Sequence, residues 1–281
     1  MTDPMLLEVA GRPVAEYVVH PEVDPRYSPR PYLHPVRTLA GVPVTDTLPA
    51  DHRWHLGVSV TMQDVSGTNL WGGRTYVRDT GYTWRADHGR ITHDSWLDRR
   101  PSGFRQRLRW CDPAGTTLLT EERAVSVGEV AGHDEAWAFD IGYALTAPAD
   151  RAISLGSPAT NGRPGGAGYG GFFWRLAPGT PHAFSAAADG EEAVNGSTEP
   201  WVALTGEGAG GQPYTLVFAG LGDGDHWFVR TGIYPGVCVA LAFDEPLPVS
   251  AGGQVQRRHR VLVVDGTLSR QQVADLVDDG S

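Results

Sequence analysis

The chain has 281 residues and a formal net charge of −10 at pH 7, which disfavours nucleic acids and anionic membranes as partners, because both attract basic surfaces. Its two cysteines, Cys111 and Cys238, are far apart in the sequence, so neither a disulfide framework nor a zinc knuckle is expected. All 23 basic residues are arginine, and the lack of lysine excludes Schiff-base catalysis and a P-loop.

The N-terminal stretch MTDPMLLEVAGRPV lacks a basic segment followed by an apolar one, as a secretory signal would have. No apolar run in the chain approaches the ~20 residues that a membrane-spanning helix needs. We therefore expect a cytoplasmic protein without a membrane segment. The oligomeric state stays open.

Most of the chain alternates apolar and polar residues with a period of two, which is typical of half-buried β-strands. The clearest example is AWAFDIGYAL, in which Trp137, Phe139 and Ile141 alternate with small or polar residues. The predicted strands, in chain order, are 55–65, 90–96, 104–110, 116–127, 136–145, 152–157, 170–176, 200–206, 214–220, 236–243 and 254–264.

One helix is predicted, at the C-terminus. Ser269 and Gln272 have the spacing of a capping box ahead of Val273, Leu276 and Val277, and Gly280 is expected to close the helix. No linker or repeat interrupts the strand pattern, so residues 1–281 are expected to form a single domain. The fold class is all-β: a large antiparallel β-sandwich, one sheet of which curves into a groove.

Two predicted strands are rich in arginine, and the role of these arginines has to be interpreted. Arg105, Arg107 and Arg109 share one face of their predicted strand, where they could bind an anion or pair across strands with Glu121 and Glu122. The basic cluster at 257–260 would divide between the two faces of its strand, and we interpret it as a solvated edge.

The glycine-rich segment TNGRPGGAGYGG (160–171) is not a phosphate-binding loop, because no helix follows it and the chain has no lysine. We expect instead a loop over the groove, with Asn161, Arg163 and Tyr169 as ligand contacts.

The motif DHRWHLG (51–57) is the main candidate for chemistry. His52 and His55 precede a strand, so a loop could point both rings inward, and Asp51 lies beside His52. With His34 and Asp64 they could hold a divalent metal, although the helical H-E-x-x-H frame is missing. Alternatively, Asp51 orients a histidine for acid/base chemistry, or the histidines only stabilise the loop.

Four blocks in this region resemble the PmoA-like family: RPYLHPV (30–36), GVPVTD (41–46), DHRWHLG and QDVSGTNLW (63–71). The family commonly has R-P-Y-x-x-P-V, D-H-P-H-H and G-D-V-N-G-x-x-F-W. A weaker likeness extends to GGFFWR (170–175) and DHWFVRTGIYPG (225–236). The chain departs from the family at Arg53 and Trp54, which stand where the family has Pro-His.

The resemblance implies a mutarotase-like sandwich, similar to those of aldose epimerases and polysaccharide lyases, and a role in carbohydrate metabolism. The family carries the label of a methane oxygenase, whereas the membrane-bound enzyme of similar name needs transmembrane helices, which this sequence lacks. On this basis we predict catalytic roles for His52, His55 and Asp51. Predicted substrate contacts are Arg30, Tyr32, His34, Asp64, Trp71, Arg74, Asn161, Tyr169, Arg175, His226, Trp227 and Arg230.

The predicted function is that of an enzyme on a sugar or oxidised keto-sugar derivative. Histidine would move protons in an epimerisation, an elimination or a glycoside cleavage. The alternatives are a non-catalytic carbohydrate-binding or sensing protein and a metal-dependent oxygenase. No metal and no cofactor are expected, and the expected partner is a small carbohydrate.

Overall fold

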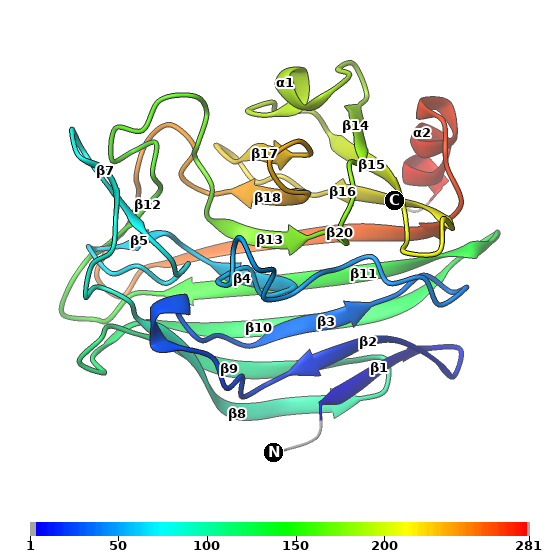
Figure 1. The fold of residues 1–281 in the computed structure, drawn as a ribbon. Helices are drawn as coiled ribbons and strands as arrows, with labels where there is room; N and C mark the ends of the chain where they lie inside the picture. The colour runs from blue at the N-terminus through cyan, green and yellow to red at the C-terminus, as the bar shows by residue number, and fades with distance from the viewer. Residues whose placement is uncertain (1–3, 280–281) are drawn as a thin grey trace.

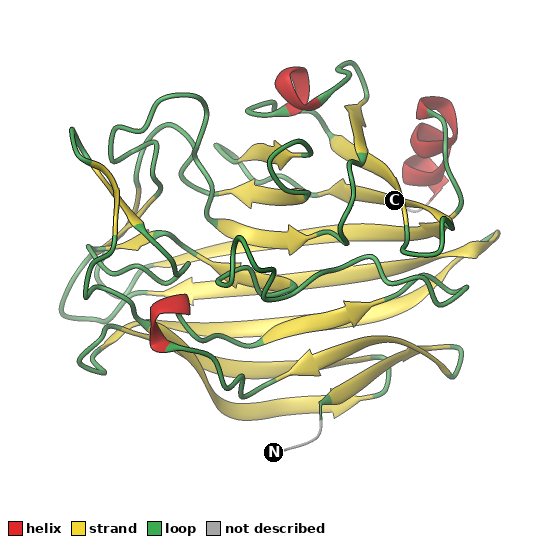
Figure 2. Cartoon of the chain, viewed as in Figure 1, coloured by secondary structure: helices red, strands yellow, loops and turns green. Residues whose placement is uncertain are grey.

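Strands dominate the structure, a computed structural model that describes residues 4–279, and helix is confined to short segments (Figure 2). Two large antiparallel sheets lie face to face (Figure 1). The predicted antiparallel β-sandwich is therefore confirmed. A single domain over the whole chain stays a prediction.

The seven-stranded sheet has the order β1-β2-β3-β4-β13-β18-β17. Its strands are β1 (Met5–Val9), β2 (Arg12–Val18), β3 (Tyr32–Val36), β4 (Val58–Thr61), β13 (Gly171–Arg175), β18 (Gly236–Ala240) and β17 (His226–Arg230). The eight-stranded sheet has the order β14-β15-β16-β20-β11-β10-β9-β8. Its strands are β14 (His182–Ser185), β15 (Trp201–Glu207), β16 (Pro213–Ala219), β20 (Gln254–Asp265), β11 (His133–Thr146), β10 (Thr117–Val130), β9 (Gly103–Cys111) and β8 (Arg90–Arg100).

Smaller elements complete the fold. A three-stranded sheet joins β19 (Leu247–Val249), β12 (Ile153–Gly156) and β5 (Asp64–Val65), and β6 (Thr75–Val77) forms a hairpin with β7 (Gly81–Thr83). The helical segments are a 3₁₀ turn (Pro25–Tyr27), α1 (Glu191–Val194) and α2 (Arg270–Asp279).

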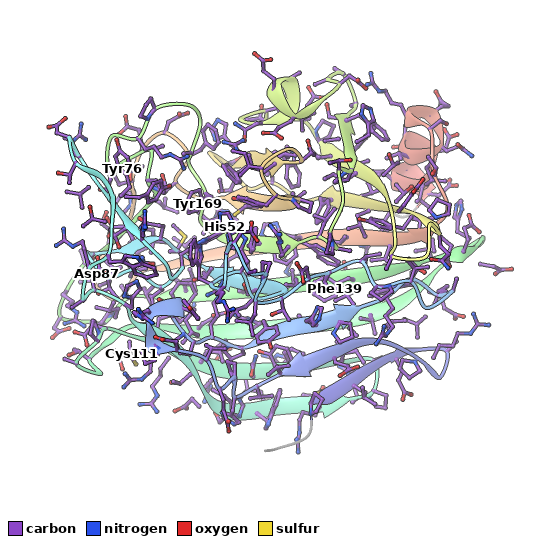
Figure 3. The ribbon with its side chains drawn as sticks, in the orientation of Figure 1. His52, Tyr76, Asp87, Cys111, Phe139 and Tyr169 are labelled. Carbon is purple, nitrogen blue, oxygen red and sulfur yellow. The ribbon has the colours of Figure 1, made fainter. Side chains whose placement is uncertain are left out.

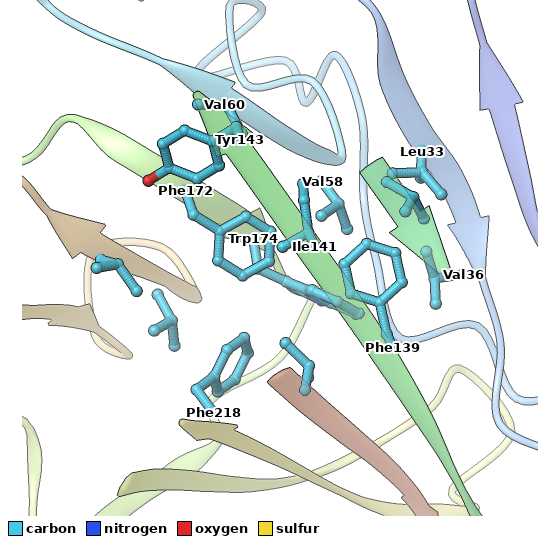
Figure 4. Close-up of a cluster of buried hydrophobic side chains, with 14 of the residues drawn as sticks. Leu33, Val36, Val58, Val60, Phe139, Ile141, Tyr143, Phe172, Trp174 and Phe218 are labelled. Carbon is cyan, nitrogen blue, oxygen red and sulfur yellow. The ribbon is translucent and has the colours of Figure 1, made fainter. Parts of the chain in front are cut away.

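The core lies between the two large sheets and follows from the period of two. Phe139 on β11 meets Trp174 on β13 at a ring-centroid distance of 5.8 Å, and Trp174 meets Phe218 on β16 at 5.7 Å. Figure 4 shows these rings between the sheets. Burial of such aromatic area is the main stabilising contribution to the sandwich.

Helix α2 covers part of the outer face of the eight-stranded sheet. The predicted capping box is formed: the Ser269 backbone N–H donates to Gln272 Oε1 (2.9 Å), and the Gln272 N–H donates to Ser269 Oγ (3.4 Å). Val273 and Leu276 are buried against the sheet, which confirms the predicted helix. Gly280 lies outside the described residues.

Several sequence expectations about strands are wrong in detail. Strand β20 lies between β16 and β11, but β16 pairs with it only from Arg260 onward, so residues 257–259 pair with β11 alone. The cluster is not simply solvated, because the chain after β16 covers part of it: His259 Nδ1 lies 2.7 Å from the Gly220 carbonyl. Within it, His259 is 3% exposed. The predicted strand 55–65 is divided into β4 and β5, because the chain leaves the large sheet after Thr61.

The arginines of β9 form cross-strand ion pairs. Glu122 lies within 3.0 Å of Arg107 and 4.0 Å of Arg105. Arg109 instead pairs with Asp94 on β8 (3.2 Å). Glu121 does not join them: it faces the core, because successive residues of β10 point to opposite faces.

No helix among residues 4–279 is long and apolar enough to cross a membrane. Both cysteines are buried and unpaired. The cytoplasmic location stays a prediction.

Candidate functional site

The outer face of the seven-stranded sheet carries the candidate site. Alternation along β13 turns Phe172 and Trp174 into the core and leaves Phe173 and Arg175 on the opposite side. An aromatic cluster packs on this outer face; its buried rings are Trp71, Tyr169, Phe173, Phe228 and Phe243, with Trp54 and Tyr234 partly buried beside them. Figure 3 labels His52 and Tyr169 on this part of the molecule.

The loop before β4 folds back on itself and brings the two histidines of DHRWHLG together. Backbone N–H groups of Leu48, His55 and Gly57 donate to the carbonyls of His55, His52 and Asp46, at 2.9, 2.9 and 3.1 Å. The imidazole rings of His52 and His55 stack with centroids 4.8 Å apart and an interplanar angle of 27°. The sequence predicts that the loop could point both rings inward: His55 is 1% exposed, whereas the side chain of His52 is 25% exposed.

His52 pairs with the carboxylate next to it in the sequence. Its Nδ1 lies 2.6 Å from Asp51 Oδ2. Burial would raise the pKa of Asp51, but the hydrogen bonds from His52 and the backbone and the nearby positive charges together outweigh it, and the pKa is lowered. In the neutral tautomer whose Nδ1–H donates to the ionised Asp51, Nε2 of His52 is the nitrogen that can accept a proton. The pair has the arrangement of a histidine base oriented by a carboxylate.

His55 lies beneath His52 and is 1% exposed. Its ring contacts Tyr234 (4.7 Å) and Phe173 (5.0 Å) edge to face, and its Nδ1 has no hydrogen-bond partner. Burial, together with the nearby His52 and two arginines, holds the pKa of His55 well below its usual value. His55 is therefore neutral near pH 7 and cannot serve as a proton donor there.

Arg175 at the end of β13 adds a positive charge to the same place. Its guanidinium lies over the Tyr234 ring at 5.1 Å and 3.9 Å from a carboxylate oxygen of Asp46. The residue is 4% exposed, and its Nε and Nη1 have no hydrogen-bond partner. Buried polar groups are normally hydrogen-bonded, so these two donors are an exception that a ligand oxygen could satisfy.

Two tryptophans stand at the rim of the site. The Trp54 indole contacts His52 (5.2 Å) and Trp84 (6.3 Å), both edge to face, and Trp84 is 44% exposed. Trp54 packs on Gly73, where a Cβ atom would lie 2.5 Å from the indole, so this position has no room for a side chain. Trp54, which stands where the PmoA-like pattern has histidine, thus packs against a glycine that leaves room for its indole.

Arg30, a predicted substrate contact, is instead a structural clamp. Its side chain is fully buried and donates to the Ser59 hydroxyl and to the carbonyls of Trp54, Trp71 and Ser28, at 3.1, 2.9, 3.0 and 3.2 Å. Burial lowers its pKa to about 9. Because these carbonyls belong to different loops, Arg30 holds the loops around the site in place.

His34 and Tyr32 lie on β3 next to the site loop. His34 Nδ1 lies 3.0 Å from the Thr45 hydroxyl, and burial lowers the pKa of His34. Tyr32 is 8% exposed, and burial raises its pKa. The Cβ of His34 would lie 3.0 Å from a Cβ added at Gly57, which places it against the turn after His55.

Of the two tryptophans predicted to contact the substrate, one lies on the outer face of the seven-stranded sheet and the other in the core. Trp71 is buried in the aromatic cluster, and its ring centroid lies 5.8 Å from that of His55. Trp227 is fully buried in the core and donates its indole N–H to the Glu199 carbonyl (2.8 Å), so it offers no surface for stacking on a sugar. Alternation on β17 places His226 and Arg230 on the outer face instead.

The remaining predicted contacts lie away from the two histidines or are already engaged. Arg230 donates to the carbonyls of Val229 and Gly166, and its guanidinium lies over Phe228 (4.3 Å). Arg74 is exposed. His226 stacks on Phe243 (4.9 Å), and its Nδ1 has no partner.

The 160–171 loop is held down by polar contacts. Arg163 donates to the Tyr82 hydroxyl (2.6 Å), which lies 2.9 Å from the Tyr169 hydroxyl. Asn161 donates to Asp64 (3.0 Å). The loop therefore covers the aromatic cluster, and Asn161 and Asp64 line a separate cavity.

Within residues 4–279, no three His, Cys, Asp or Glu side chains come together so as to hold a metal ion. His34, His52 and His55 thus do not form a ligand set. That the protein binds neither metal nor cofactor stays a prediction.

Sequence reasoning did not select three residues of the site: Tyr234, Asp46 and Trp84. Tyr234 lies in the segment DHWFVRTGIYPG, which resembles the PmoA-like family. The tyrosine follows a turn, however, and the direction of this turn has no sequence signature. Asp46 ends the block GVPVTD. It is far from Arg175 in the sequence, and only the folding of the chain brings the two side chains together. Trp84 follows the short hairpin β6–β7, which sequence periodicity did not identify.

Comparison with known proteins identifies the family. Residues 5–278 match the sequence model of a family of unknown function (DUF6807). The chain belongs to this family. No curated protein matches the chain. The label of the PmoA-like family is not found, so that resemblance stays a prediction.

Among solved structures, the chain is similar to an α-galactosidase from Lactobacillus brevis (14% identity, TM-score 0.39, 73% of this chain and 30% of that one). A putative kojibiose phosphorylase from the human microbiome gives 12% identity and a TM-score of 0.35 over 68% of this chain and 24% of the other. A polysaccharide lyase gives 11% identity and a TM-score of 0.39 over 95% and 34%. The chain thus spans about a third or less of each of these proteins.

Proposed function

We propose that this protein is an enzyme that acts on a sugar or an oxidised keto-sugar derivative, with His52 as the group that moves a proton. The observation that carries the proposal is the Asp51–His52 pair, with its 2.6 Å contact, beside the unpartnered donors of Arg175. A histidine with an oriented tautomer and a free Nε2 is suited to take up and return a proton near neutral pH.

In this proposal, Nε2 of His52 takes a proton from a carbon next to the substrate carbonyl. Negative charge then develops on the carbonyl oxygen, and the free N–H groups of Arg175 stabilise it. Return of the proton by His52 to the same face regenerates the substrate, whereas a proton from water delivered to the opposite face gives epimerisation. Loss of a neighbouring leaving group, which takes up the proton from His52, gives elimination. Glycoside cleavage needs the same histidine to protonate a leaving oxygen.

His55 and Tyr234 have supporting roles. Stacked neutral His55 adds no positive charge next to His52, whereas a second imidazolium there would disfavour proton uptake. Burial raises the pKa of Tyr234, which keeps the phenol protonated beneath Arg175. The tryptophans at the rim offer aromatic faces on which the apolar side of a sugar ring can stack.

The test uses reducing sugars, uronates and 3-keto-glycosides in D₂O, with proton exchange and product formation followed by NMR. Replacement of His52 by alanine should lower turnover by ~10²–10⁴ and leave the fold intact. His182, the exposed first residue of the edge strand β14, is the matched control, because it also lies 3.2 Å from an aspartate, Asp189. Equal turnover of His52→Ala and His182→Ala would contradict the proposal.

A carbohydrate-binding or sensing protein without turnover is the second candidate. It is favoured by one observation: two cavities of the structure, of about 380 and 260 Å³, are lined by neither His52 nor His55. Saturable binding of a sugar by the wild-type protein, without exchange or cleavage of any substrate in the panel, would support this candidate over the enzyme.

A further inference from the structure

A second polar cavity lies beside the hairpin β6–β7, away from the histidine pair. Its volume is about 260 Å³, and its walls come from the end of β4, the turn at Asp64, the hairpin and the 160–171 loop. Figure 3 labels two of its lining residues, Tyr76 and Asp87, on the side of the molecule that carries β7. None of the proposed catalytic residues lines it.

The strongest feature of this cavity is the side chain of Gln63. Three buried polar residues alternate along β4 and just after it, on the side that faces away from the core: Ser59, Thr61 and Gln63. Ser59 accepts a hydrogen bond from Arg30, and Thr61 donates one to the Leu70 carbonyl. Gln63 is 1% exposed, and neither its Oε1 nor its Nε2 has a partner.

An amide with both ends unpartnered is costly to bury unless something in the cavity completes it. Asp87, which also lines the cavity, adds an unpartnered acceptor: its Oδ2 lies 3.4 Å from Arg85 Nε, while its Oδ1 has no hydrogen bond and lies 3.9 Å from His88 Nδ1. Three polar atoms of two residues that line the cavity, Gln63 Oε1, Gln63 Nε2 and Asp87 Oδ1, thus have no hydrogen-bond partner within the protein.

Charge and size narrow the class of ligand. Asp64 and Asp87 are the carboxylates of the lining, and Arg78 and Arg85 are its guanidinium groups, so their formal charges cancel. This balance favours neither an anion nor a metal cation. The hydroxyl group both donates and accepts, so a ligand with adjacent hydroxyls matches the free amide and carboxylate atoms.

Tyr76 supplies an aromatic ring to the same lining, against which the apolar face of a sugar can pack. The volume is below the range of about 300–1,000 Å³ typical of drug-sized ligands, which suits a single sugar unit. Asp64 is already fixed as an acceptor of hydrogen bonds from Asn161 (3.0 Å) and the Gly67 N–H (2.7 Å), so one wall is preorganised.

We propose that this cavity is a binding site for one neutral monosaccharide unit, recognised by Gln63 and Asp87. The site is separate from the proposed proton-transfer site, and it does not depend on His52. The unit can be a free sugar or the terminal residue of a glycan, since both offer the same hydroxyl groups.

The experiment titrates the protein with D-glucose, D-galactose, D-mannose and D-xylose and with their methyl glycosides, by calorimetry and ligand-observed NMR. Wild type should bind at least one of these sugars saturably. Gln63→Met keeps the length of the side chain without the amide and should weaken binding at least tenfold. Asp87→Asn, which keeps the shape but loses the charge, should weaken it less.

Gln212→Met is the control for the glutamine change, because Gln212 is exposed and does not line the cavity. It should bind like wild type, and so should His52→Ala. Equal affinity for free sugar and methyl glycoside supports recognition of a glycan end, and preference for the free sugar supports a monosaccharide ligand.

The melting temperature gives a second readout. Because no residue hydrogen-bonds the Gln63 amide, Gln63→Met should not lower it. The proposal is overturned if none of these neutral sugars binds saturably or if Gln63→Met binds as tightly as wild type. Weaker sugar binding by Gln63→Met together with turnover equal to that of wild type would separate this site from the proposed catalytic one.

Discussion

Two buried histidines of this protein sit in similar aromatic surroundings but differ in their hydrogen bonds. His259 on β20 stacks on Phe172 in the core, and its two nitrogens lie 3.0 Å from the Tyr143 hydroxyl and 2.7 Å from the Gly220 carbonyl. His55 on the outer face of the other sheet packs against Phe173 and Tyr234, yet its Nδ1 has no partner.

Two buried arginines, Arg123 and Arg175, differ in their hydrogen bonds in the same way. Arg123 in the core donates from Nε and Nη2 to the two carboxylate oxygens of Glu121, at 2.6 and 2.9 Å. Burial alone would lower the pKa of Arg123, but the charges and hydrogen bonds of Glu121 and Tyr17 together more than offset it and raise the pKa. Arg175 on the outer face keeps two unpartnered donors.

The comparison teaches where to look for function in a sandwich of this kind. In the core, the chain itself completes each polar group, because nothing else can reach it. On the outer face, loops cover His55 and Arg175 without completing all of their polar atoms. Unsatisfied groups in one place are therefore better indicators of a binding site than the presence of histidine or arginine alone.

The largest expected effect comes from breaking the completed core network. Replacement of Glu121 by leucine leaves Arg123 as an uncompensated buried charge and removes the acceptor of the Trp110 indole N–H (2.7 Å). We expect a loss of about 3–5 kcal/mol in the free energy of unfolding, measured by urea denaturation. Glu122→Leu, at an exposed ion pair on the same strand, is the control and should cost under about 1 kcal/mol.

A loss below about 1 kcal/mol for Glu121→Leu would mean that the network is not required for stability. The contrast between the core and the outer face would then have no energetic basis.

The pH dependence of stability tests the same contrast through His259. Burial lowers the pKa of His259 from 6.5 to about 4, so as the pH falls below 6.5 the unfolded chain takes up a proton that the folded protein does not. Stability is therefore full above pH about 7 and decreases toward pH 4, with about 2 kcal/mol from His259 lost by pH 5. The lowered pKa values of His34 and His55 act in the same direction.

Urea denaturation at several pH values between about 7.5 and 5 measures this loss. His259→Leu should flatten the dependence. A stability that stays constant over this range would contradict the buried, neutral state of His259.

The fold could be predicted from the sequence where strands are long and half-buried. The 14-residue strands β10 and β11 alternate in burial over residues 120–127 and 139–146, and α2 has its capping box. Short strands such as β5, β6 and β7 have two or three residues each, too few for a period to be recognised. The order of strands in the sheets depends on long-range pairing, which periodicity does not contain.

The candidate site could be predicted only as far as it is local in sequence. Asp51, His52 and His55 lie within five residues, so their contact depends on one loop. Trp227 was assigned to a ligand face on resemblance, whereas alternation on β17 turns it into the core. Tyr234 joins the site across β18 and β13, a relation that requires the three-dimensional register.

A matched pair of substitutions sharpens the comparison of the two histidines. His259→Leu leaves the Tyr143 hydroxyl and the Gly220 carbonyl without partners, which should cost about 1–3 kcal/mol. His55→Leu removes a nitrogen that already lacks a partner and should cost less. Urea denaturation at pH 7.5 compares the two, and a greater loss for His55→Leu would reverse the assignment of core and site.

The smallest expected effect on stability is at Arg175. Its Nε and Nη1 have no partners, and Asp46 lies 3.9 Å away, so a neutral side chain of similar length loses little. We expect Arg175→Met to change the free energy of unfolding by under about 1 kcal/mol, in either direction, because burial of a charge without a close partner is itself unfavourable. The same variant should lose binding or turnover of the substrate, since it removes the donors proposed to face the substrate oxygen. A large loss of stability with unchanged substrate handling would assign Arg175 to the framework, as the structure does for Arg30.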